Sequence, residues 1–182
     1  MTDATDGLQL RVGRNEAGYV VQLEGRGTLR ESPALSIFVR DILDREPSSL
    51  VVLELSDCTY LDSTFLGCIV ALHKRYAQLP PARFLIWAPA DVRDLLLAPT
   101  RLDRVLTAAA NPPVRPQEWL TLPIAQLNTD EFGQHVARCH LELAELDGPD
   151  AAAFRRIVAA RSGRRTSAAL ELTSWSFRLT AP

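Results

Sequence analysis

The sequence predicts an α/β fold, a mixed β-sheet with helices packed on one face, followed by a C-terminal, mainly helical extension. Two observations lead to this class. From residue 51 onward, short apolar runs alternate with segments of helical spacing, which favours parallel strands joined by right-handed crossovers. Ahead of residue 24, a segment that alternates apolar and polar residues is followed by a turn and a second, apolar strand-like segment, which favours an antiparallel hairpin. A sheet with both kinds of pairing is mixed.

The first elements follow from this spacing. Residues 8–12 and 19–23 are the two strands of the expected hairpin. Residues 24–29 are expected to form a loop, because their two glycines permit unusual backbone angles. A helix should follow over residues 33–43, with Ser32 as its cap and a proline at its first position.

The central stretch, residues 51–78, predicts a strand, a loop and a helix in turn. The apolar run over residues 51–55 suits a buried strand. After a polar break come Asp62, Ser63 and Thr64, whose side-chain oxygens can accept hydrogen bonds from the unpaired N–H groups of a helix start. Apolar residues then recur at helical spacing, on a face wide enough to be mostly buried.

The remaining predicted elements define the expected boundaries of the domain, the linker and the extension. A strand over residues 83–87 and a short helix over 91–97 complete a first domain, residues 1–110. Residues 111–128 form a proline-rich linker by composition. Residues 129–182 form the helical extension.

Two amphipathic segments make up most of that extension. They cover residues 129–146 and 149–161 and predict a helical hairpin. Such helices pack on their own domain more often than on a partner, so we expect the former. The tail over residues 170–179 alternates like a strand with a bulge, and it either joins a sheet edge or a partner or stays flexible.

Composition excludes several classes. With 182 residues, 47% of them hydrophobic, the chain can bury a sizeable core. A net charge of −2 argues against a dedicated nucleic-acid binder. No apolar run reaches the roughly 20 residues needed to span a bilayer, and the N-terminus does not resemble a signal peptide. Three cysteines without a CxxC motif (Cys58, Cys68 and Cys139) fit a reduced, cytoplasmic protein.

Catalytic and metal chemistry find little support. The sequence contains neither a phosphate-binding glycine loop nor a nucleophile elbow. A triad of Ser63, His73 and Asp62 fails because His73 lies roughly 15 Å along the same helix from the serine. His135 and Cys139 share a helix face at a spacing that can hold a metal, but two ligands do not make a site. We therefore expect no catalytic residue, no metal and no cofactor.

The local sequence alone allows two roles for Ser63. It can merely cap the helix that begins there. Alternatively, it is exposed and accepts a phosphate, whose charge near −2 would switch a binding surface. The neighbouring Asp62 makes that phosphate costly to place, so the residues alone favour the capping role.

The segment Thr59-Tyr60-Leu61-Asp62-Ser63-Thr64-Phe65-Leu66-Gly67 resembles the signature of STAS domains of the anti-sigma factor antagonist type. Only Phe65 departs clearly, since the family usually has glycine there. The glycine-containing segment 24–29 and the segment 100–106 are also similar to STAS domains, so the resemblance covers roughly residues 8 to 110.

The resemblance implies a role for each matching position. Ser63 stands where the family is phosphorylated by a partner kinase, with Thr64 as the second choice. A partner-binding surface would comprise six residues: Gly25, Gly27, Asp62, Ser63, Thr64 and Phe65.

The resemblance further implies a bacterial, cytoplasmic, non-enzymatic phosphoprotein of signal transduction and transcription regulation. Unphosphorylated, it would sequester an anti-sigma factor that is also a serine kinase, and a PP2C-type phosphatase would reset it. Homodimerisation stays open. The alternatives are a scaffold subunit of a stress-signalling complex or of a lipid-transport ATPase complex, which the extension favours, and a small-ligand sensor.

Overall fold

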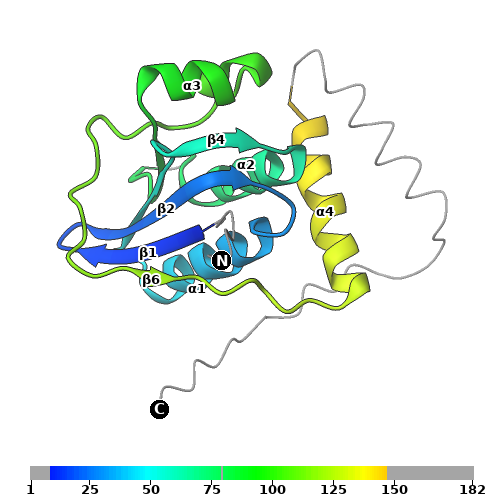
Figure 1. Ribbon diagram of the computed structural model, residues 1–182, viewed down its shortest axis with the longest axis horizontal. Coiled ribbons are helices and arrows are strands. Elements are labelled where there is room, and N and C mark those ends of the chain that lie inside the picture. Colours follow the sequence, from blue (N-terminus) through cyan, green and yellow to red (C-terminus); the bar gives the residue numbers. More distant parts are fainter. Residues whose placement is uncertain (1–8, 79, 147–182) are drawn as a thin grey trace, which may run out of the picture.

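The computed structural model describes residues 9–78 and 80–146 (Figure 1). The predicted helix over residues 149–161 and the predicted strand-like tail lie outside the described residues.

The described residues contain a six-stranded mixed sheet, which confirms the predicted class. The strands pair in the order β5-β3-β2-β1-β6, and β4 pairs with the far end of β2. The pairs of β1 with β2 and with β6 are antiparallel, whereas β2 with β3, β2 with β4 and β3 with β5 are parallel. Their bounds are β1 (Gln9–Asn15), β2 (Gly18–Gly27), β3 (Leu50–Glu54), β4 (Cys58–Leu61), β5 (Phe84–Trp87) and β6 (Leu120–Thr121).

Two long helices, α1 (Ser32–Arg45) and α2 (Ser63–Tyr76), lie on the same side of this sheet (Figure 1). The inner residues of β2 and β3 are fully buried there, as the alternation of a strand packed on helices requires. A short helix, α3 (Ala90–Leu96), and two 3-10 turns (Ala98–Thr100 and Leu102–Arg104) follow β5. The last described helix, α4 (Thr129–Ala144), lies against α2.

The chain between residues 112 and 119 covers part of the other face of the sheet. Its prolines and Trp119 face Gln22 and Glu54 across a cavity of about 210 Å³, and both polar residues are buried. Gly13 leaves room for this segment, because a Cβ there would lie 2.4 Å from the Cβ of Pro116. The segment predicted as a linker thus continues into β6, an edge strand too short to show a sequence pattern.

Three local predictions are corrected by the structure. The cap of α1 is Glu31 and not Ser32, since the helix begins at Ser32 and no side chain caps it. Residues 24–27 are strand and not loop: β2 runs to Gly27, with an irregularity at Gly25, whose φ is +76°. The polar break contains β4, whose buried ends and exposed middle do not alternate.

Among the described residues, no helix combines the length and the apolar composition that crossing a bilayer requires.

Candidate functional site

Asp62 organises the junction between β4 and α2. One carboxylate oxygen, Oδ1, accepts a hydrogen bond from the amide of Phe65 at 2.8 Å and so caps α2. The other, Oδ2, accepts from the amide of Leu29 at 2.7 Å. The amide of Asp62 donates to the carbonyl of Gly27 at 2.9 Å. The acid therefore holds the end of β2 and the following turn against the start of the helix.

The structure brings five of the six predicted site residues to this junction, whereas Gly25 pairs with Cys58 at the opposite end of β4. It buries three of the six, Gly27, Thr64 and Phe65. Phe65 is fully buried and Thr64 is 2% exposed. A Cβ at Gly27 would lie 3.0 Å from the Phe65 ring, so the glycine leaves the space that this ring needs. Direct partner contacts through Thr64 and Phe65 stay predictions, because both side chains face inward in this arrangement.

Ser63, the first residue of α2, is half-buried and contacts a histidine that the sequence did not suggest. Its hydroxyl lies 3.1 Å from Nε2 of His140, which is also 3.4 Å from the hydroxyl of Thr64. His140 belongs to α4, 77 residues farther along the chain. No local spacing relates positions 63 and 140, because their contact depends on where α4 docks.

Helix α4 packs closely against α2. A Cβ at Gly67 would lie 2.0 Å from the carbonyl oxygen of Cys139, so the two backbones are in direct contact. Nζ of Lys74 lies 2.7 Å from carboxylate oxygens of both Glu142 and Glu145. The first turn of α4 is closed by a capping box in which the side chains of Asn128 and Glu131 bond each other's backbone amides. Together these contacts cover part of the surface around Ser63.

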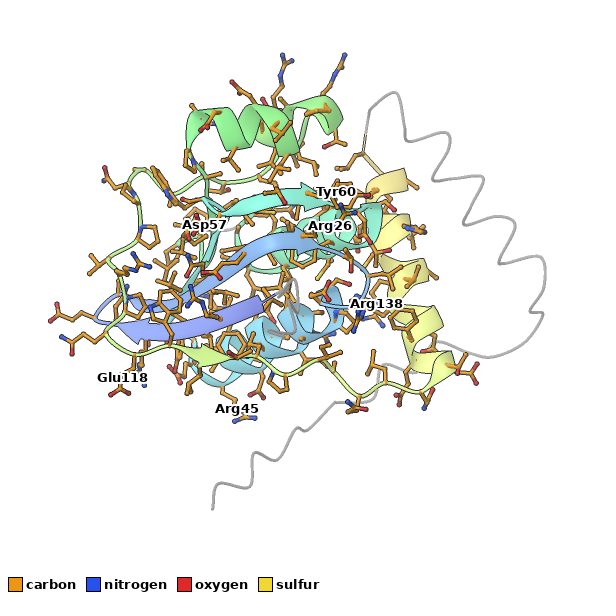
Figure 2. The ribbon with its side chains drawn as sticks, viewed as in Figure 1. Arg26, Arg45, Asp57, Tyr60, Glu118 and Arg138 are labelled. Carbon is orange, nitrogen blue, oxygen red and sulfur yellow. The ribbon has the colours of Figure 1, made fainter. Side chains whose placement is uncertain are left out.

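Next to this covered area lies an exposed rim. The guanidinium of Arg26 lies over the ring of Tyr60, 4.1 Å from its centroid, and Figure 2 shows the pair side by side on neighbouring strands. Tyr60 is 41% exposed and Leu29 is 38% exposed, so large apolar groups face solvent here. Arg30 adds a second exposed cation. Arginine beside exposed aromatic and aliphatic groups is typical of protein-binding surfaces.

A hydroxyl beside an imidazole is also the start of a nucleophilic site, but the third member of a triad is not the adjacent acid. Both oxygens of Asp62 already bond the amides of Phe65 and Leu29, so this carboxylate does not orient His140. His73, the histidine weighed from sequence, instead bonds the hydroxyl of Thr107 at 2.9 Å. Residues 9–78 and 80–146 contain no group of three potential ligands placed to hold a metal ion.

No family model and no curated protein matches this sequence. Among solved structures, the chain is similar to an anti-sigma factor antagonist from Mycobacterium paratuberculosis, with 21% identity and a TM-score of 0.46 over 59% of this chain and 90% of that one. It is also similar to an uncharacterized protein with a SpoIIAA-like fold from Shewanella loihica, with 9% identity and a TM-score of 0.39 over 56% of this chain and 84% of that one. Both are likenesses of fold.

Proposed function

We propose that this chain is an anti-sigma factor antagonist, a non-enzymatic switch set by phosphorylation of Ser63. The observation that carries the proposal is the Asp62–Ser63 junction, where a half-buried serine hydroxyl stands at the start of α2 beside an exposed rim. Unphosphorylated, the surface would bind an anti-sigma factor that is also a serine kinase. A PP2C-type phosphatase would remove the phosphate and restore binding.

A phosphate at this position would change both size and charge. It carries about −1.5 to −2 charges and three acceptor oxygens. The first turn of α2 favours an anion, because its amides point toward Ser63. Asp62 opposes it, because a like charge stands on the adjacent residue. A partner packed closely on the unmodified hydroxyl would lose both its fit and its electrostatic match.

Helix α4 limits access to this switch. His140 contacts the hydroxyl that the kinase would modify, so the kinase reaches Ser63 when α4 moves away from α2. The rim of Arg26, Leu29 and Tyr60 is exposed without any such movement. The partner would first contact this rim.

The covered serine also favours a second candidate, a scaffold subunit in which the Ser63 surface serves internal packing. In that case Ser63 and Thr64 hold α4 through His140, and no kinase acts on them. A stable assembly with other proteins, unchanged by substitution of Ser63, would support this candidate.

The test is a binding titration against anti-sigma factor kinases from the same organism. The full-length chain is compared with Ser63→Ala and Ser63→Asp. We expect Ser63→Ala to bind within a few-fold of the wild type and Ser63→Asp to bind at least about tenfold more weakly, which is about 1.4 kcal/mol. Incubation with ATP should phosphorylate the wild type and not Ser63→Ala, while Thr64→Val should still be phosphorylated. Equal affinity of all variants for every such kinase would contradict the switch.

A further inference from the structure

Two thiols lie where α4 crosses α2, about one and a half helical turns from Ser63. Cys68 lies on α2, and its Sγ donates to the carbonyl oxygen of Ser32 at 3.4 Å. Cys139 lies on α4, next to His140, and its Sγ is 3.6 Å from Nε2 of His135. The same ring nitrogen lies 2.8 Å from the hydroxyl of Ser32. This cluster therefore joins α1, α2 and α4.

The backbones of α2 and α4 touch next to these cysteines. A Cβ at Gly67, the neighbour of Cys68, would lie 2.8 Å from Cα of Cys139. Both sulfurs lie around Ser32, since Sγ of Cys68 is 3.4 Å from its carbonyl oxygen, and the His135 nitrogen that contacts Sγ of Cys139 is 2.8 Å from its hydroxyl. A disulfide needs Cα atoms about 4.4–6.8 Å apart, and this close backbone contact favours such a separation.

The pair is also chemically polarised. The hydrogen bond with the Cys68 thiol lowers the pKa of Cys139 most strongly, burial opposes it, and His135 and Arg138 lower it further. The same hydrogen bond, together with burial, raises the pKa of Cys68 well above its ordinary value. Cys139 is thus the sulfur that loses its proton more readily, and the thiolate so formed is the reactive species. Cys58 is different, because burial raises its pKa to about 11.

We propose that Cys68 and Cys139 form a reversible redox site whose disulfide fastens α4 over Ser63. The disulfide itself is independent of the proposed function. Its consequence for the serine rests on that function, because a fastened α4 keeps a kinase away from the hydroxyl.

The oxidant is hydrogen peroxide, which converts the two thiols into a disulfide in two steps. The Cys139 thiolate attacks one oxygen of hydrogen peroxide, the O–O bond breaks, and hydroxide leaves, so that Cys139 becomes a sulfenic acid. The Cys68 sulfur then attacks the Cys139 sulfur and the S–O bond breaks. The departing hydroxide takes the proton of Cys68 and leaves as water. Two thiols lose two electrons, and a small dithiol reverses the change by thiol–disulfide exchange.

Because both cysteines are buried, oxidation of this site depends on movement of α4. Cys68 is 1% exposed and Cys139 is 2% exposed, so peroxide reaches the thiolate when α4 lifts from α2. When α4 returns, Gly67 again brings the two sulfurs together. Oxidation therefore captures the closed arrangement.

The experiment uses the full-length, fully reduced chain. It is exposed to hydrogen peroxide, the remaining thiols are alkylated, and intact mass and peptide mapping are recorded. We expect an intramolecular loss of two hydrogen atoms, a peptide pair linking Cys68 to Cys139, and full recovery with a dithiol. Cys58→Ser is the matched control and should behave like the wild type. Cys68→Ala and Cys139→Ala, chosen because alanine suits buried positions, should not form the link.

Several outcomes would overturn the proposal. They are a link through Cys58, a link between two chains as the main product, and no link at peroxide levels that oxidise exposed thiols. Since the first readout needs only the wild type, a variant that fails to fold does not prevent the test.

A second readout separates this proposal from the proposed function. Reduced and oxidised chains are compared as substrates of the kinase that phosphorylates Ser63. We expect the oxidised chain to be phosphorylated at least about tenfold more slowly. Equal rates with a confirmed disulfide would overturn the fastening of α4. Absence of phosphorylation in both forms, with a confirmed disulfide, would count against the proposed function alone.

Discussion

At the scale of single residues, Gly67 sets how closely α4 approaches α2. A methyl group there would overlap the carbonyl of Cys139, which is backbone and cannot rotate away. We predict that Gly67→Ala displaces α4 and destabilises the chain by about 1–3 kcal/mol, the usual cost of overpacking. The measurement is urea unfolding together with alkylation of Cys139, which should become faster in the variant.

Gly133 provides the matched control. It also lies in a helix, α4, but a Cβ there would have nothing within 4 Å. Gly133→Ala should therefore leave the alkylation rate unchanged or lower it, because alanine favours the helix by about 1 kcal/mol over glycine. Unchanged stability of Gly67→Ala would mean that the backbones are farther apart than described.

His73 carries a prediction about pH. Its side chain is 5% exposed, and among the described residues its Nδ1 is buried without a hydrogen-bond partner. Burial lowers the pKa of His73 below its ordinary value, since a charged ring is poorly solvated there. Above about pH 6.5 the ring is neutral in both folded and unfolded chains and contributes nothing to the pH dependence.

As the pH falls below about 6.5, the unfolded chain binds a proton at His73 that the folded chain resists, so stability decreases. The loss continues until the pH reaches the lower pKa of the folded state. We predict that His73→Gln makes the unfolding free energy depend less steeply on pH between about 6.5 and 5. Parallel curves for the variant and the wild type in urea titrations would contradict this assignment.

Sequence reasoning at this scale located the starts of both long helices, because residues whose side chains accept hydrogen bonds from the first amides mark a helix start. The residues favoured Ser63 as the cap of α2, whereas the structure places the cap one residue earlier, at Asp62, whose side chain accepts from the amide of Phe65. The cap of α1 was assigned one residue late, since Glu31 and Ser32 are both polar and the backbone angles decide between them. The contact of His140 with Ser63 depends on the docking of a distant helix, so no local pattern predicts it.

At the scale of elements, Lys74 links α2 to the second half of α4. Its ammonium bonds Glu142 and Glu145, and it is 28% exposed. An ion pair of this exposure contributes only about 0–1 kcal/mol. Replacing Lys74 by glutamate destabilises the docking of α4 more than loss of the ion pair, because three carboxylates would then face one another.

We therefore predict that Lys74→Glu weakens the docking of α4 by about 1–2 kcal/mol and makes Cys139 easier to alkylate. The double variant Lys74→Glu with Glu142→Lys should regain most of the loss. Arg75→Glu breaks the neighbouring pair with Asp44 of α1 and should leave the alkylation rate unchanged. Failure of the charge swap to rescue would show that the pair does not position α4.

The same scale shows which elements a sequence can predict. The helix that became α4 was expected from its amphipathic spacing, and its packing on the same chain agrees with that expectation. Strands β4 and β6 were missed, because four residues with an exposed middle and two exposed residues carry no alternation. They form because β2 and β1 offer unpaired edges.

At the scale of the whole molecule, the mixed sheet was predictable because the order of strands and helices restricts the topology to few choices. The sequence did not predict that the other face of the sheet would be covered. The proline-rich segment lies over that face by fitting beside Gly13 and Gln22, which depends on shape and not on periodicity. Likewise, Cys139 and Leu143 join the main core cluster, so α4, the part of the extension that the structure describes, is packed against the domain.

This joint packing does not make every part equally stable. Helix α4 contacts mainly one neighbour, α2, whereas β3 lies between β2 and β5 and is buried on both faces. Segments with fewer buried contacts open at a lower free energy than the central strands. We predict that the amides of α4 exchange with deuterium well before those of β3, through openings that leave the sheet intact.

Hydrogen exchange of the full-length, reduced chain, followed by mass spectrometry, measures this order. Peptides from residues 132–144 should exchange at least about tenfold faster than peptides from residues 50–54, which corresponds to at least about 1.4 kcal/mol between local and global opening. Equal protection of both segments would mean that α4 leaves only when the domain unfolds. Ser63 would then be closed to any kinase in the folded chain, and the scaffold candidate would be favoured.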